Sequence, residues 1–284
     1  MMYNVSWFIC FIIGVSAPYI KCEKIQYIKQ PTWDSALNFK EIEEQLKSQP
    51  IIAVKEMRAY LKENQKKDSF QHAVYLVTLA NGLKAVFKPA SKQQSPYGEV
   101  AAYRASTWLG QRLVPPTVLR EYQGQPGSLQ FFVESPIDLF KPEERKHALS
   151  LLSNKAKSDM NIFYFVFRGR ISAHWGNKLI AVDKESKGHV AIIDSSSLIK
   201  RKRRLLWNKI LAKNKKEYSL LAQDPFVYSK QTLKRYKELS LKALHWIFKD
   251  ALEHNVADCT PDFFNDILER KNQVLTAAHK VLVP

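Results

Sequence analysis

VFKP at residues 86–89 and GEVAAYR at residues 98–104 form the stretch that decides the fold. The first segment ends an apolar run with Lys88, and the proline after it stops strand pairing because it has no N–H to donate. The second segment has apolar residues at helical spacing, with Glu99 in its first turn. A carboxylate there complements the helix dipole, which is the structural explanation for Glu99. The pattern also allows Glu99 to pair with Lys88 across a strand and the helix packed on it.

A hairpin is expected just before Lys88. Residues 72–79 are rich in Val, Tyr, Leu and Thr, and residues 83–87 return after the turn Ala80-Asn81-Gly82. Asn-Gly tolerates the positive φ angles of a tight hairpin turn, so we expect two antiparallel strands. This hairpin places Lys88 at the end of its second strand. Taken alone, Lys88 is more simply explained as an edge lysine in a solvated strand.

The second informative stretch is HWGN at residues 174–177, with IID at residues 192–194. Two short apolar runs joined by a polar turn at residues 183–188 predict a hairpin that brings Asn177 and Asp194 to one edge. An amide oxygen and a carboxylate are what a hard cation that bridges phosphates requires. Taken singly, Asn177 could be a turn residue and Asp194 a solvated strand end.

The order of the remaining segments predicts a mixed α+β fold. Extended segments continue through residues 113–119 and 128–133, and Glu134-Ser135-Pro136 then leaves the sheet. Helical spacing of apolar residues follows in residues 142–152, 160–168, 232–254 and 260–281. We therefore expect a small β-rich N-lobe over residues 23–134 and a larger helical C-lobe over residues 135–284.

Two earlier segments, residues 39–46 and 54–61, also have apolar residues at helical spacing, with Ser48-Gln49-Pro50 between them. They predict two short helices, or a helix followed by a first strand. Residues 23–33 read as a mobile lead-in.

Residues 1–22 are expected to be a secretory signal peptide, which would make the protein secreted or place it in the secretory pathway. The apolar run from Val5 to Ile20 is interrupted by Gly14 and Pro18 and is too short for a comfortable membrane span. An uncleaved anchor and a buried N-terminal element remain open.

The composition is globular and strongly basic. The 284 residues are 45% apolar, and 44 Lys and Arg stand against 27 Asp and Glu, which gives a formal charge of +17. This charge favours anionic partners such as phosphorylated ligands, acidic membrane surfaces or nucleic acid. The three cysteines, Cys10, Cys22 and Cys259, are too few for a disulfide framework and have no zinc-ligand spacing.

The ordered motifs over residues 70–200 resemble the atypical kinase superfamily. This superfamily contains the phosphatidylinositol 3/4-kinases, small bacterial relatives and the secretory-pathway kinases. The resemblance is carried by Val-Phe-Lys-Pro, Gly-Glu-Val-Ala-Ala-Tyr, Leu-Gly-x-x-Leu-Val-Pro-Pro-Thr-Val-Leu-Arg, an apolar strand, His-x-x-Asn and Ile-Asp. It implies a two-lobed protein-kinase-like fold that binds ATP with Mg²⁺ or Mn²⁺ and phosphorylates a protein or phosphoinositide hydroxyl.

The resemblance also implies a role for each matching residue. Lys88 would contact the nucleotide phosphates, and Glu99 would orient Lys88. The segment from Gln130 to Glu134 would line the adenine pocket. Asn177 and Asp194 would ligate magnesium.

The catalytic motif of that superfamily, Asp-Arg-His-x-x-Asn, is incomplete in this chain. His174 matches its histidine, but Ser172 and Ala173 stand at the Asp-Arg positions. A serine hydroxyl has no useful basicity near neutral pH. Because positioning and charge neutralisation supply most of phosphoryl transfer, slow transfer with His174 as the base and a nucleotide-binding pseudokinase both remain open. His174 could also be a structural histidine.

A basic run follows Asp194: Lys200, Arg201, Lys202, Arg203 and Arg204, with further lysines up to Lys216. By the same resemblance, this run would bind an acidic lipid or an acidic protein. It could also be a solvated helix face or an RNA-binding patch. Nucleic acid is disfavoured because Trp207 is the only stacking aromatic close to the run. Without ATP binding, the run would favour a basic lipid- or partner-binding module.

Overall fold

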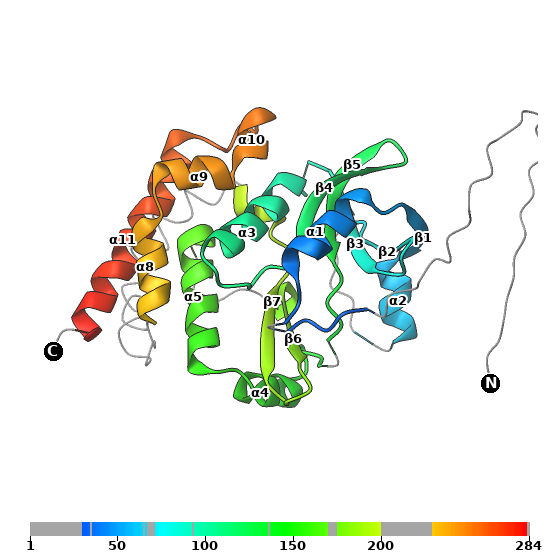
Figure 1. The fold of residues 1–284 in the computed structure, drawn as a ribbon, viewed down its shortest axis with the longest axis horizontal. Helices are drawn as coiled ribbons and strands as arrows, with labels where there is room; N and C mark the ends of the chain where they lie inside the picture. Colours follow the sequence, from blue (N-terminus) through cyan, green and yellow to red (C-terminus); the bar gives the residue numbers. More distant parts are fainter. Residues whose placement is uncertain are drawn as a thin grey trace, which may run out of the picture.

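The computed structural model describes residues 30–34, 36–64, 66, 72–92, 94–135, 137–169, 175–199 and 229–282. Within these ranges, a five-stranded antiparallel sheet is followed by a mainly helical part that contains a two-stranded hairpin. Figure 1 shows helix α3, Pro96–Trp108, between the sheet and the later helices. The mixed α+β class predicted from the order of segments is confirmed.

The sheet has the strand order β1-β2-β3-β5-β4, and each neighbouring pair is antiparallel. Its strands are β1 Ile51–Glu56, β2 Tyr75–Leu79, β3 Lys84–Pro89, β4 Thr117–Tyr122 and β5 Gln125–Phe131. The predicted Asn-Gly turn joins β2 to β3, and Gly82 there has a φ of 89°. Gln123 and Gly124 join β4 to β5 with φ angles of 52° and 75°. Positive φ at both positions matches the twist of a two-residue hairpin.

The two faces of the sheet differ because side chains alternate along each strand. One face carries the buried residues Val77, Leu79, Ala85, Phe87, Leu129 and Phe131. Helix α1, Phe39–Ser48, covers this face with Ile42 and Leu46 (Figure 1). The other face carries Lys88 and Gln130, because residues paired in register point to the same side and Lys88 pairs with Ser128.

The region before β2 contains a helix followed by a strand, which is the second of the two predicted alternatives, and then a further short helix. After α1 the chain forms β1, and helix α2, Met57–Glu63, starts directly after that strand.

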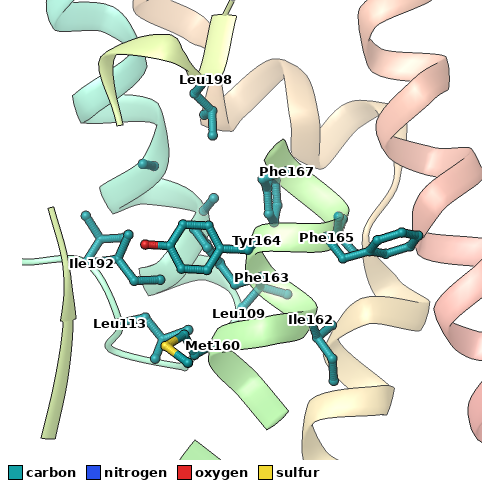
Figure 2. Close-up of a cluster of buried hydrophobic side chains, with 14 of the residues drawn as sticks. Leu109, Leu113, Met160, Ile162, Phe163, Tyr164, Phe165, Phe167, Ile192 and Leu198 are labelled. Carbon is teal, nitrogen blue, oxygen red and sulfur yellow. The ribbon is translucent and has the colours of Figure 1, made fainter. Parts of the chain in front are cut away.

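The helical part is built around α5, Asn154–Arg168. Ser153 caps its N-terminus, and Gly169, with a φ of 60°, ends it. Its aromatic residues form the centre of the largest buried cluster, where Tyr164 and Phe165 point to opposite sides of the helix (Figure 2). Around α5 lie α4, Pro142–Ser150, and the hairpin of β6, Lys178–Val182, and β7, Gly188–Ile192.

The last described segment consists of α8 Lys230–Glu238, α9 Leu241–Ile247, α10 Lys249–Glu253 and α11 Pro261–Leu282. The apolar pattern of residues 232–254 is thus divided among three helices. The break has a local cause, because Ser240 is extended and its side chain accepts a hydrogen bond from Ala243 N at the start of α9.

The segment before α1 is firmly packed in its described part, so the prediction of a mobile lead-in is wrong for residues 30–33. Trp33 is only 4% exposed and stacks on Phe131 of the sheet. Its Nε1 donates to the carbonyl of Val190 in β7 at 3.0 Å. Gln30 accepts from Lys84 N at 2.7 Å. This segment therefore ties the sheet to the β6–β7 hairpin.

No helix of the described ranges is long and apolar enough to cross a bilayer. The predicted signal peptide, residues 1–22, lies outside the described residues. The boundary between lobes after residue 134 stays a prediction.

Candidate active site

A buried ion pair joins the sheet to α3. Lys88 lies near the end of β3, and its Nζ is 2.8 Å from Glu99 Oε1 in the first turn of α3. Lys88 is 5% exposed and Glu99 is fully buried. Buried charges need partners, because an unpaired ion loses its hydration without compensation. The pairing predicted between these two side chains is confirmed.

Glu99 also binds the loop that begins at Asp194. Its Oε2 accepts from Ser195 N at 2.9 Å, and its Oε1 accepts from Ser196 N at 3.1 Å. One carboxylate thus binds a lysine of the sheet and two backbone N–H groups of a loop almost a hundred residues away. The position of Lys88 is thereby coupled to that of the Asp194 loop.

Gly98 makes this close approach possible. A Cβ atom on Gly98 would lie 2.8 Å from Ser195 O and 3.0 Å from Ser196 O, closer than a side chain can come to backbone atoms. Helix α3 can therefore approach the loop only because position 98 has no side chain. Pro96 at the start of the helix fixes where this first turn begins.

The β6–β7 hairpin brings Asn177 and Asp194 to the same edge, as predicted. Lys178 pairs with Ile192, and the next residue, Ile193, donates its N–H to Asn177 O at 2.9 Å. Asp194 then leaves the hairpin with a φ of 56°, in the left-handed region. A non-glycine residue held there is uncommon and often marks a functional loop. Ser196 Oγ donates to Asp194 Oδ1 at 3.1 Å and orients the carboxylate.

Tyr164 of α5 contacts the backbone at Asn177, at this edge of the hairpin. Its hydroxyl donates to Asn177 O at 3.2 Å, and Figure 2 shows the ring directed from α5 toward Ile192. Burial raises the pKa of the Tyr164 hydroxyl, Arg168 opposes this shift, and Asp194 adds to it, so the tyrosine remains a neutral donor. Two cations flank the ring: Lys178 Nζ lies 5.4 Å and the Arg168 guanidinium carbon 5.5 Å from its centroid.

These residues fit a magnesium or manganese ion that also binds phosphate oxygens. Asp194 and Asn177 supply a carboxylate and an amide, both hard oxygen donors. Within the described ranges, no group of three or more His, Cys, Asp or Glu side chains could hold a metal ion without further ligands. An ion held by Asn177 and Asp194 would therefore need ligands from elsewhere, and Mg²⁺ commonly takes them from substrate phosphates and water.

The two predicted adenine-pocket residues have different environments. Gln130 is 2% exposed and lies on the sheet face that carries Lys88. The side chain of Glu134 is 56% exposed, and its Oε1 is 3.4 Å from Lys84 Nζ. Gln130 therefore lies beside the ion pair, whereas Glu134 lies at the surface just beyond the end of β5.

The remaining predicted site residues lie outside the described residues. They are Ser172 and His174 of the incomplete catalytic motif and the basic run Lys200, Arg201, Lys202, Arg203 and Arg204. The structure does not place them relative to Asp194.

The sequence contains no Gly-x-Gly-x-x-Gly, the pattern of the loop that covers the phosphates in protein kinases. No glycine occurs between residues 15 and 81, so the connection from β1 to β2 contains none. Backbone N–H groups can approach a phosphate closely where glycine leaves room. A phosphate at Lys88 would thus depend more on side chains in this protein.

Sequence comparisons give no relative: no protein-family model matches the chain, and neither does any curated protein. Solved structures do match. The structure of the Golgi casein kinase aligns with 85% of this chain and 75% of its own, with a TM-score of 0.52 and 12% sequence identity. The chain has a protein-kinase-like fold. The predicted two-lobed class is therefore confirmed. At 12% sequence identity, the similarity shows the fold but does not identify the substrate.

Two other matching structures have lower scores. A structure of the Golgi casein kinase with Mn and ADP bound aligns with 84% of this chain and 75% of its own, at a TM-score of 0.49 and 13% identity. The Helicobacter pylori proinflammatory kinase CtkA aligns with 74% of this chain and 94% of its own, at a TM-score of 0.44 and 16% identity.

Proposed function

We propose that the protein is a kinase-like phosphotransferase that binds ATP with Mg²⁺ or Mn²⁺ and phosphorylates a hydroxyl group of a protein or phosphoinositide. The observation that carries this proposal is the triple bonding of Glu99 to Lys88 Nζ, Ser195 N and Ser196 N. Protein kinases need a phosphate-binding lysine fixed by a helix glutamate and, nearby, an aspartate that holds the metal. Here one glutamate fixes the lysine and the loop of the aspartate together.

Each described residue then has a distinct task. Lys88 would bind the nucleotide phosphates as a fixed cation, and Glu99 would keep it in place. Asn177 and Asp194 would hold the metal ion. When bound, that ion would bridge phosphate oxygens and offset the charge on the transferred group. Tyr164 keeps Asn177 in register through its hydrogen bond to the Asn177 carbonyl.

The acceptor in this proposal is an acidic protein or an anionic lipid in the secretory pathway. The formal charge of +17 favours a negatively charged partner. The basic run after Asp194 and the predicted signal peptide support the same choice.

A nucleotide-binding pseudokinase is the second candidate. Ser172 supports it, because this residue stands where the resemblance predicts the catalytic aspartate. A serine cannot accept the proton of the attacking hydroxyl near neutral pH. The two candidates share the nucleotide site and differ only in phosphate transfer.

A transfer assay separates them. Purified protein would be incubated with γ-labelled ATP and Mg²⁺ or Mn²⁺, with an acidic protein, phosphoinositide vesicles, or no added acceptor. An active kinase transfers label, and Lys88→Met abolishes the transfer. Lys84→Met is the matched control, because Lys84 is on the same strand but pairs with Glu134 at the surface. ATP binding without transfer to any acceptor would favour the pseudokinase.

Absence of ATP binding would contradict both candidates. The protein would then be better described as a basic lipid- or partner-binding module. Salt-sensitive binding to anionic vesicles that is lost on neutralising Lys200, Arg201, Lys202, Arg203 and Arg204 would support that function.

A further inference from the structure

The side chain of Gln130 has its orientation fixed by a chain of hydrogen bonds. Thr117 Oγ1 donates its single proton to Pro115 O at 2.7 Å. It is also 3.0 Å from Gln130 Nε2, and with its proton already used it can only accept there. The amide nitrogen of Gln130 must therefore face Thr117, which settles the orientation of an otherwise ambiguous amide.

This orientation leaves two hydrogen-bonding groups of Gln130 for a ligand. They are the carbonyl Oε1 and the second N–H of Nε2. Within the described part of the chain, no residue donates a hydrogen bond to Gln130 Oε1. Gln130 Oε1 is also not fully enclosed, because it is not one of the fully buried side-chain atoms without a partner, so a ligand can reach this acceptor.

The neighbours of Gln130 on this sheet face differ in burial. Toward the end of β3, Pro89 and Ser128 are buried. In the opposite direction lies Val86, which is partly exposed and pairs in register with Gln130. A nucleotide with its phosphates at Lys88 would pass Val86, at the edge of the apolar cluster around Met57 and Phe132, to reach Gln130. Gln130 lies diagonally from Lys88, roughly 7–8 Å away between Cα atoms, a span that a ribose bridges.

We infer that Gln130, oriented by Thr117, selects adenine over 6-oxopurines in the nucleotide site. The inference rests on the proposed nucleotide binding and adds a residue that chooses the base. Adenine presents an amino donor at position 6 beside a ring-nitrogen acceptor, the pattern that a glutamine amide matches with its oxygen and its N–H. Guanine and hypoxanthine present a carbonyl at position 6, so two acceptors would face each other.

The test is a set of dissociation constants for the Mg²⁺ complexes of ATP, GTP and ITP, measured by titration calorimetry on the full chain. ITP carries a carbonyl at position 6 and lacks the 2-amino group of GTP, so it isolates the contact at position 6. The unchanged protein should bind ATP at least about tenfold more tightly than ITP. Gln130→Met should bring the ratio close to one, mainly by weakening ATP.

Two more variants complete the design. Thr117→Val keeps the shape of the residue but frees the Gln130 amide to rotate, so the preference for ATP over ITP should also fall. If Gln130→Met does not fold, the result for Thr117→Val tests the inference instead. Ser128→Ala is the matched control, because Ser128 is buried on the same face and its Oγ has no partner in the described structure. Its ratio should equal that of the unchanged protein.

The outcomes distinguish this inference from the proposed function. ATP binding with a ratio that Gln130→Met leaves unchanged, or with no preference over ITP, overturns the inference while the proposed function stands. Failure of the unchanged protein to bind any of the three nucleotides overturns both.

Discussion

Replacing Glu99 with glutamine should destabilise the protein strongly, although the two side chains have nearly the same shape. Both oxygens of Glu99 are used, by Lys88 Nζ at 2.8 Å, Ser195 N at 2.9 Å and Ser196 N at 3.1 Å. Glutamine has only one acceptor oxygen, so its NH₂ group must face at least one of these donors. Lys88 would also keep a buried charge without its counterion. Breaking a buried pair on one side costs about 3–5 kcal/mol.

Thermal unfolding measures this loss. For a chain of this size, each kcal/mol lowers the melting temperature by about 2–4 °C, so Glu99→Gln should lower it by about 6–20 °C. Glu134→Gln is the control, because the Lys84–Glu134 pair is exposed and its loss should cost less than about 1 kcal/mol.

A double-mutant cycle tests the reasoning itself. In the Lys88→Met background the lysine charge is absent, so Glu99→Gln should cost much less than it does alone. An equal loss in both backgrounds, or a loss no larger than that of Glu134→Gln, would refute the coupling of Glu99 to Lys88.

Three further predictions concern the loop contact, the N-terminal segment and the described cysteine. Gly98→Ala should lower the free energy of unfolding by about 1–3 kcal/mol and weaken Mg²⁺–ATP binding in calorimetry, because the new Cβ would lie 2.8 Å from Ser195 O. Gly188→Ala is the control, because its Cβ would lie 3.0 Å from Leu152 Cδ2, so this variant should lower stability without changing ATP binding. Trp33→Phe removes the donor to Val190 O and should cost about 1–3 kcal/mol in thermal unfolding, and an unchanged melting temperature would contradict the role of this bond. Burial raises the pKa of the Cys259 thiol to about 11, so alkylation of the Cys259 peptide, followed by mass spectrometry, should accelerate about tenfold per pH unit from pH 8 to 10; a plateau near pH 9 would contradict this.

Local signals were enough to predict the elements that carry the Lys88–Glu99 pair. The Asn-Gly turn fixed the β2–β3 hairpin, and Ser95-Pro96 marked the start of α3. The ion pair was predictable as well, because Lys88 lies near the end of a strand and Glu99 near the start of the helix that follows it in the sequence. The hairpin that joins Asn177 to Asp194 was predictable for the same reason, because short strands and a polar turn are local features.

The contacts between distant segments were not predictable from these patterns. Ser195 and Ser196, 96 and 97 residues away, bind Glu99 through their backbone N–H groups. Because every residue except proline has a backbone N–H, the residue types at these positions do not indicate such a contact. Gly98 was the available signal, since a glycine in a helix often marks a close approach of another segment. Trp33 was misread because its partner, Val190, is 157 residues away.

The central claim is that Lys88, Glu99 and Asp194 form one site for a metal-bound nucleotide. It is tested most directly by the melting temperature of the protein with ATP, with and without Mg²⁺, for the unchanged chain, Asp194→Ala and Asp183→Ala. Asp183 is the matched control, because it lies in the turn at the other end of the same hairpin. We predict that ATP with Mg²⁺ raises the melting temperature of the unchanged chain and of Asp183→Ala, but not of Asp194→Ala. No rise in the unchanged chain, or an equal rise in Asp194→Ala, would contradict the claim.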